Sequence, residues 1–163
     1  MSRFWPRNIK RVIIKTQAGL PEKCNCGGEI GLDYLAVGLA GFLGAVSRAL
    51  LAKYIKIGYA GEFPVDTLVI NLTGCFILCF FMLVTLERLR INPKLRLAVG
   101  TGFCGAYTTF STFSVESINL LRDGRTAGAF EYIIITGLGC VVAGWLGTST
   151  GRLLTRHEKR TAH

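Results

Sequence analysis

The sequence predicts an all-α integral membrane protein with four transmembrane helices. Half of its 163 residues are hydrophobic, and four long apolar runs occupy most of residues 33–155. A helix needs about 20 apolar residues to cross a hydrocarbon core of about 30 Å, so four spans fill this stretch. The connections are short and leave no room for a second globular domain. We therefore expect a basic tail (residues 1–32), a membrane domain (33–155) and a second basic tail (156–163).

The first predicted span covers residues 34–57 and combines small residues with one charge. Gly41 and Gly44 recur at a spacing that lets two helices approach closely. Arg48 follows one turn later. A charge near the middle of a membrane costs at least about 2.5–3.5 kcal/mol on insertion scales, so it normally faces protein, water or the interface. Arg48 therefore either extends to the membrane surface or has a functional role.

The second predicted span covers residues 65–86 and contains one strongly polar side chain, Asn71. Asn71, Cys75 and Cys79 form a stripe with four-residue spacing. An amide surrounded by lipid needs a hydrogen-bond partner, so we expect Asn71 to face the protein interior. Two alternatives follow. The amide either binds a neighbouring helix or presents its NH2 donors to an anion.

The third predicted span covers residues 95–121, and its composition does not fit a plain lipid-facing helix. Its glycines weaken a helix, and five hydroxyl side chains crowd into residues 108–114. Phe110 and Phe113 share a face if this part is helical. Polar backbone and hydroxyls at membrane depth are tolerated where they are buried in protein or line a cavity. The stretch is therefore either a packed polar seam or a binding or conduction site.

The fourth predicted span covers residues 127–154 and has one mildly polar face made of small side chains. Members of this face repeat every four positions: Tyr132, Thr136, Cys140, Gly144 and Thr148. The spacing places them on one side of a helix, where they can pack closely against another span.

Basic residues predict the orientation of the chain. Leaving out Arg48, fourteen Lys and Arg residues fall on the side of the two termini and four on the opposite side. The positive-inside rule then places both termini in the cytoplasm. The positive charges of residues 1–32 are suited to anionic lipid headgroups. Charge alone also permits nucleic-acid binding, but no recognition module supports it.

Several functional classes lack the side chains that they need. No Ser-His-Asp, Cys-His or paired-carboxylate arrangement exists within the spans, so an enzyme is not expected. Cys24 and Cys26 form a lone Cys-x-Cys, whereas a zinc site needs about four ligands. A proton-coupled exporter is the alternative transporter class, and it requires a titratable carboxylate inside a span. Glu116 is the one candidate for that role.

Three blocks of sequence carry a specific resemblance. They are GFLGAVSR at residues 41–48, TLVINLTG at 67–74, and GFCGAYTTFSTFSVE at 102–116. Together they are similar to the signature blocks of the CrcB/Fluc fluoride channel family, over about residues 33–155. The resemblance implies four-span subunits in the cell (plasma) membrane that assemble as antiparallel, dual-topology dimers with two pores. It also implies passive, fluoride-selective efflux that protects the cell from fluoride toxicity.

The resemblance assigns roles residue by residue. The implied fluoride pore residues are Asn71, Thr109, Phe110, Ser111, Thr112, Phe113, Tyr132 and Thr136. Arg48 corresponds to a basic residue in the aqueous vestibule, and Glu116 gives polar support. The backbone carbonyls of Gly105 and Thr108 correspond to those that hold a structural Na⁺ at the dimer interface, where the third span is broken near Gly105.

Two residues depart from the family pattern, and the charge of the loops is unbalanced. Asp66 and Ala106 stand where many relatives carry glycine, so we expect altered packing or vestibule charge. A subunit that inserts in both orientations should have nearly balanced loop charge, and fourteen against four is not balanced. The chain therefore forms an antiparallel homodimer despite this bias, or it pairs with an oppositely oriented homologous subunit.

Overall fold

The computed structural model describes residues 29–59, 61, 63–87 and 91–161, and every regular element in these ranges is a helix. The chain divides into two units, Met1–Ile30 and Gly31–His163. Apart from the first two residues of α2, the described helices belong to the second unit. Most of the predicted basic tail, with Cys24 and Cys26, lies outside the described residues.

Three helices in the described part of the chain are long and apolar enough to cross a membrane. They are α2 (Glu29–Gly58), α3 (Val65–Glu87) and α7 (Thr126–Thr161). Their apolar stretches have mean hydropathies of 1.8, 2.4 and 1.7. The predicted all-α class is confirmed, and these helices coincide with three of the four predicted spans. α7 continues as a helix through most of the segment expected as a second tail.

The predicted third span is built from pieces. It comprises α4 (Pro93–Leu97), the π-helical stretch η1 (Ala98–Cys104), the short α5 (Gly105–Tyr107) and α6 (Phe110–Arg122). Asn92 begins the series because its side chain accepts a hydrogen bond from the Lys94 amide at 3.0 Å, with Pro93 at the first helical position. No single helix of spanning length exists over residues 93–122.

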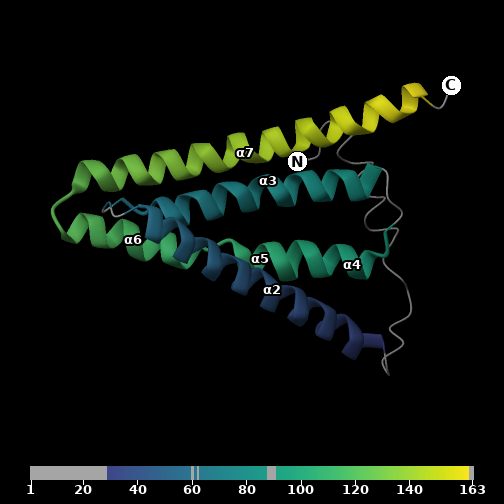
Figure 1. The fold of residues 1–163 in the computed structure, drawn as a ribbon, viewed down its shortest axis with the longest axis horizontal. Coiled ribbons are helices and arrows are strands. Elements are labelled where there is room, and N and C mark those ends of the chain that lie inside the picture. The colour runs from purple at the N-terminus through teal and green to yellow at the C-terminus, as the bar shows by residue number, and fades with distance from the viewer. Residues whose placement is uncertain (1–28, 60, 62, 88–90, 162–163) are drawn as a thin grey trace, which may run out of the picture. The chain divides into compact units, whose positions relative to one another are not determined.

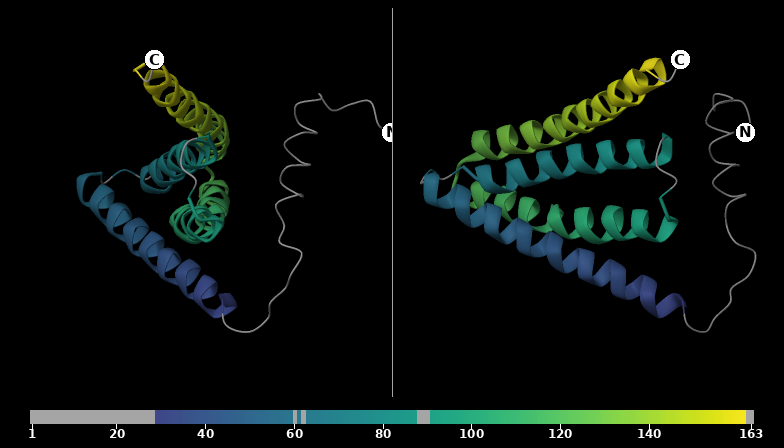
Figure 2. Two further views of the ribbon diagram at one scale, coloured as in Figure 1. Left: turned by 90° about the vertical axis from the view of Figure 1, so that its right-hand side faces the viewer. Right: turned by 45° about the vertical axis from the view of Figure 1, so that its right-hand side comes forward.

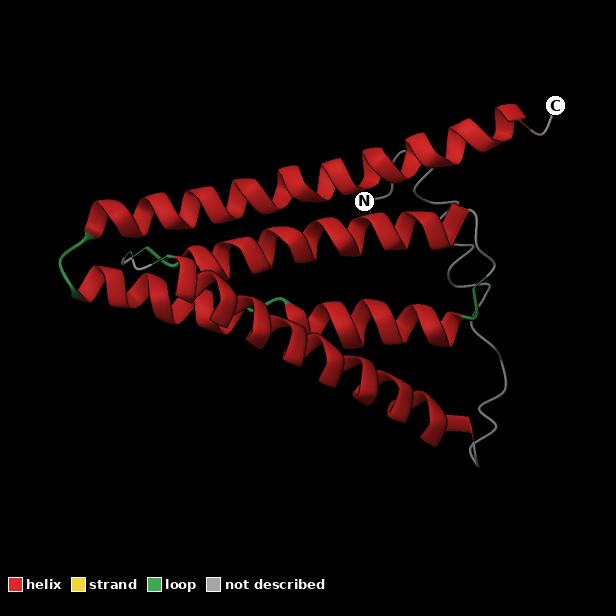
Figure 3. Cartoon of the chain, in the orientation of Figure 1, coloured by secondary structure: helices red, strands yellow, loops and turns green. Residues whose placement is uncertain are grey.

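The helix is broken at Thr108 and Thr109 (Figure 3), beginning three residues after Gly105, near which the resemblance places the break. Gly105 itself is helical, with φ −66° and ψ −32°. Thr108 is extended with ψ 155°, and Thr109 is extended with φ −144° and ψ 114°. Thr109 then caps α6, since its side chain accepts a hydrogen bond from the Thr112 amide at 3.2 Å.

α3 and α7 lie side by side along most of their length (Figure 1) and form the most extensive helix contact. Small residues on α7 permit the close approach, because a Cβ on Gly147 would lie 2.5 Å from the carbonyl oxygen of Phe76. α2 runs at an angle to the other helices (Figure 2), and glycines bring it close to the π-helical stretch. There a Cβ on Gly44 would overlap the carbonyl of Phe103, and a Cβ on Gly102 would lie 2.6 Å from the carbonyl oxygen of Val37.

Large apolar side chains cover much of the described surface. Examples are Phe42 on α2 and Leu138 and Trp145 on α7, each of which is 65–66% exposed. The fully buried side chains are few and include Ile70 and Tyr132. Lipid tails and subunit interfaces both accommodate such apolar surfaces, so the pattern agrees with a multi-pass membrane protein.

Candidate pore site

The break in the third segment is held by the side chain of Asn71 from α3. The Thr109 amide donates to Asn71 Oδ1 at 2.9 Å, and Asn71 Nδ2 donates to the Thr109 carbonyl at 3.1 Å. Both residues are buried. A buried backbone N–H needs a partner, and Asn71 Oδ1 supplies it where the helix no longer does, while Asn71 Nδ2 gives the Thr109 carbonyl a donor from another helix. Of the two alternatives for Asn71, the interhelical contact is therefore formed, and one N–H of its NH2 group remains for a second acceptor.

The same break changes the partners of two backbone carbonyls. In a continuous helix the Gly105 carbonyl would accept from the Thr109 amide, and the Thr108 carbonyl would accept from the Thr112 amide. Here the Thr109 amide donates to Asn71, and the Thr112 amide donates to the Thr109 hydroxyl. The two carbonyls assigned by resemblance to a cation have thus lost their helical donors.

A cavity of about 310 Å³ lies beside the break. Five of the eight predicted pore residues line it: Asn71, Thr109, Phe110, Phe113 and Thr136. The rings of Phe110 and Phe113 have centroids 5.8 Å apart and planes inclined by 43°. Phe110 is 80% exposed in the single chain, whereas Phe113 is partly buried. Aromatic rings, an amide and hydroxyls from three helices therefore meet in one cavity.

Thr136 contributes a hydroxyl with a specific property. Its Oγ1 is the one buried side-chain nitrogen or oxygen without a hydrogen-bond partner among the described residues. Thr136 is 5% exposed and lines the cavity from α7. Buried hydroxyls are nearly always paired, so an unpaired one beside a cavity is available to a ligand.

The remaining predicted pore residues lie around the cavity but do not line it. The hydroxyls of Ser111 and Thr112 lie 3.3 and 2.9 Å from the Thr109 hydroxyl, so these groups satisfy one another at the start of α6. Tyr132 packs against Phe113, which lines the cavity, and the centroids of the two rings are 5.2 Å apart. Arg48 is half-buried on α2, apart from this lining.

Glu116 joins three helices immediately behind the aromatic pair. The Thr67 hydroxyl on α3 donates to its Oε1 at 3.0 Å, and the Tyr132 hydroxyl on α7 donates to its Oε2 at 2.9 Å. Tyr132 is fully buried between Phe113 and Phe63, the latter edge-on at 5.5 Å. The carboxylate therefore fixes the tyrosine that supports Phe113. Thr67 was not predicted, because its partner lies 49 residues away.

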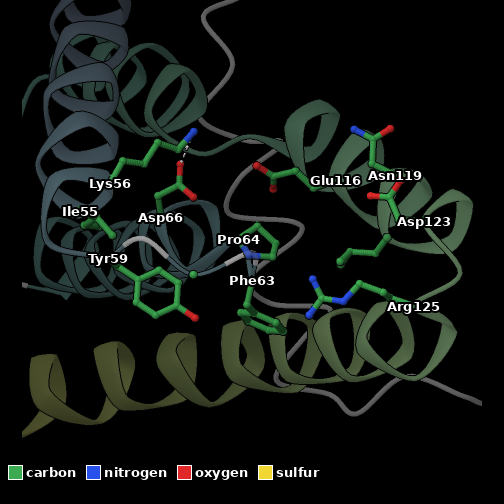
Figure 4. Close-up of a pocket in the computed structure, with 12 residues that line it drawn as sticks. Ile55, Lys56, Tyr59, Phe63, Pro64, Asp66, Glu116, Asn119, Asp123 and Arg125 are labelled. Atoms are coloured by element: carbon green, nitrogen blue, oxygen red, sulfur yellow. Dashed lines mark ion pairs between the residues drawn. The ribbon is translucent and has the colours of Figure 1, made fainter.

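A second, more polar cavity of about 570 Å³ also reaches Glu116. Figure 4 shows Glu116, Asn119 and Asp123 on one side of it and the Lys56–Asp66 ion pair on the other. Lys56 Nζ lies 3.1 Å from Asp66 Oδ2, and the lysine side chain is 67% exposed. Asp66 thus adds a carboxylate at this cavity and pairs it with the ammonium group of Lys56. This agrees with the altered local charge that we expected.

The support of Glu116 gives a testable prediction for stability. Replacing Thr67 with valine or Tyr132 with phenylalanine removes one donor from the carboxylate, which should cost about 1–3 kcal/mol for a buried acceptor left unpaired. Thermal unfolding of the purified protein in detergent measures the loss. Ser114→Ala, which removes a more exposed hydroxyl bonded to the Phe110 carbonyl, serves as the control. Equal stability of all three variants and the original chain would contradict the network.

The residues that match known proteins include the whole site. The family model described as "CrcB-like protein, Camphor Resistance (CrcB)" matches residues 35–148. The "Fluoride-specific ion channel FluC 1" of Moorella thermoacetica is 45% identical over 120 residues, which are 74% of this chain and 84% of that protein. FluC 2 of Geobacillus kaustophilus is 45% identical, over 70% of this chain and 88% of its own length. FluC 1 of Bacillus cereus is 40% identical, over 77% and 91% respectively.

Proposed function

The chain belongs to the CrcB-like family, and from this premise we propose that it is a subunit of a fluoride-selective ion channel in the cell membrane. The channel lets F⁻ leave the cell passively and so protects the cell from fluoride toxicity. The relatives are named as ion channels and not as enzymes, which agrees with the absence of catalytic arrangements in the sequence.

One observation carries the proposal: a single cavity collects Phe110, Phe113, Asn71 and Thr136. Fluoride is small, and removing an ion-sized charge from water into a low-dielectric medium costs on the order of 20 kcal/mol. The edge of a phenylalanine ring is the positive end of its quadrupole. Ring edges, the second N–H of Asn71 and the unpaired Thr136 hydroxyl together replace water. Because each contact is weak, the ion can also leave.

The start of α6 adds a favourable field at this cavity. Phe110 is the first residue of the helix, and the threonine cap at Thr109 fixes its position. The N-terminus of a helix carries a partial positive charge and unpaired N–H groups, which favour an anion nearby. Ser111 and Thr112 serve this arrangement by holding the cap, rather than by contacting the ion.

Exposed residues on both sides of the break favour assembly with a second subunit. Residues 93–122 form the fourth crossing, and their extended backbone at Thr108 and Thr109 is tolerated at membrane depth only where protein covers it. In the single chain Gly105 is exposed and Phe110 is 80% exposed. An antiparallel homodimer covers this surface and completes two pores. The charge bias of the loops makes an oppositely oriented homologous subunit the alternative partner.

A structural Na⁺ fits the freed carbonyls. Na⁺ is a hard cation that prefers oxygen ligands, and the carbonyls of Gly105 and Thr108 no longer have their helical donors. At the subunit interface they would hold the ion together with their counterparts from the second subunit. The bound charge would stabilise the dimer and favour an anion in the neighbouring pores.

Growth in fluoride tests the proposal in cells. A bacterium without its own fluoride channel should grow at higher fluoride concentrations when it produces this chain, and Thr136→Val should reduce the benefit because it removes the unpaired hydroxyl at nearly constant volume. Thr150→Val, on the outer part of α7 with its hydroxyl bonded to the Leu146 carbonyl, is the matched control. No gain in tolerance from the membrane-inserted original chain would speak against the function.

A further inference from the structure

Two cysteines line the proposed pore cavity from opposite helices. Cys75 lies on α3 and Cys140 on α7, and both belong to the lining that includes Phe110 and Phe113. The contacts of Leu72 with Gly139 and of Cys79 with Gly144 place the two cysteines at the same level of the packed helices. Each is a free thiol and is only partly buried, so a solute in the cavity can reach the sulfur atoms.

Close contacts on both sides of the pair hold α3 and α7 together at this level. Just before the pair, Leu72 lies against Gly139, where a Cβ would be 3.3 Å from the leucine side chain. One turn after it, Cys79 lies against Gly144, where a Cβ would be 3.1 Å from Sγ of the cysteine. These close contacts belong to the most extensive helix pair in the structure. The thiols are therefore held together by rigid elements and not by a flexible loop.

We propose that Cys75 and Cys140 form a binding site for a soft, two-coordinate cation of the mercury(II) class. Thiolates are the ligands that soft metals select, and two of them suffice for linear coordination. Binding of Hg²⁺ forms two Hg–S bonds and releases the two thiol protons to water, with no change in oxidation state. If the cavity is the fluoride path, as the proposed function holds, the bound ion obstructs it. Fluoride, a hard anion, does not compete for the thiols.

Mercury binding to the purified protein tests the site without any flux measurement. The test uses the full chain with Cys24 and Cys26 replaced by serine, because these are the only cysteines outside the described residues. Titration with HgCl₂ in detergent, followed by sulfur-to-mercury absorbance in the ultraviolet, should show one tight equivalent per chain. Cys75→Ser or Cys140→Ser should weaken it by more than the about 10–100-fold typical of losing an outer-shell partner, because a direct ligand is lost.

Cys79→Ser and Cys104→Ser are the matched controls, since both retain the pair and change a neighbouring thiol in the same spans. Tight binding that survives in the Cys75→Ser/Cys140→Ser double variant, or that disappears with Cys79→Ser, would overturn the site.

Fluoride efflux measured with and without HgCl₂ then tests whether the mercury site lies in the fluoride path. Inhibition that requires both Cys75 and Cys140 supports the pore position, while stoichiometric binding with undiminished efflux would overturn the obstruction. A chain that binds Hg²⁺ but conducts no fluoride would refute the proposed function and leave the site intact.

Discussion

Replacing both Phe110 and Phe113 with isoleucine should lower fluoride efflux by about tenfold to a hundredfold. A well-oriented aromatic contact contributes about 0.5–1.5 kcal/mol beyond burial, and a tenfold change in rate corresponds to about 1.4 kcal/mol. Both rings line the cavity, so the double variant removes both contributions. Isoleucine keeps the site apolar and cannot present a positive ring edge. The measurement is the initial rate of F⁻ efflux from liposomes that contain equal amounts of protein.

Phe80→Ile is the control for this experiment. Phe80 stacks on Phe76 along α3, with ring centroids 6.2 Å apart, and it does not line the cavity. Its replacement should leave the rate of efflux near that of the original chain. If the Phe110→Ile/Phe113→Ile protein is folded and still conducts fluoride at the original rate, the rings are not part of the path.

Asn71→Leu should have the largest effect on stability. The substitution leaves the buried N–H of Thr109 without its partner, which costs about 1–3 kcal/mol, and removes one hydrogen bond to the Thr109 carbonyl, which is worth about 0.5–1.5 kcal/mol. A loss of about 1.5–4.5 kcal/mol is large beside the marginal stability of most proteins. Thermal unfolding in detergent measures it, and Asn119→Leu, which removes an exposed amide on α6, serves as the control. An unchanged midpoint would show that the amide does not hold the break.

Asn71→Asp separates support of the break from conduction. The aspartate retains an oxygen that accepts from the Thr109 amide, but it loses the donor to the Thr109 carbonyl and places a negative charge in the cavity. We expect efflux to fall even in protein that remains folded, because like charges repel in a medium of low dielectric constant. Efflux at the original rate would restrict Asn71 to a structural role.

The fold class was predictable because the length of an apolar run directly measures its ability to cross a membrane. α2, α3 and α7 follow from composition alone. The place of the break did not follow. The resemblance implied a break near Gly105, and the chain is extended three residues later, at Thr108 and Thr109. The reason is a tertiary contact: Asn71, 38 residues away, replaces the helical acceptor of the Thr109 amide and donates to the Thr109 carbonyl.

The site was predictable in outline from the same blocks of sequence. Four-residue spacing placed Asn71 with Cys75, and Tyr132 with Thr136, on single helix faces, and the structure brings Asn71, Cys75 and Thr136 to one cavity. The spacing of residues along one helix does not show which residues of another helix they contact. For that reason the shared cavity of Cys75 and Cys140 and the hydrogen bond of Thr67 to Glu116 emerged only in three dimensions.

In our proposal this chain forms a passive path for fluoride that discriminates against other halides. The most direct measurement uses purified protein in liposomes loaded with potassium fluoride or potassium chloride, with efflux followed by an ion-selective electrode after valinomycin is added. We predict rapid F⁻ efflux, negligible Cl⁻ efflux and no dependence on a proton gradient. Chloride passing as readily as fluoride, or fluoride transport that requires a proton gradient and Glu116, would contradict the account.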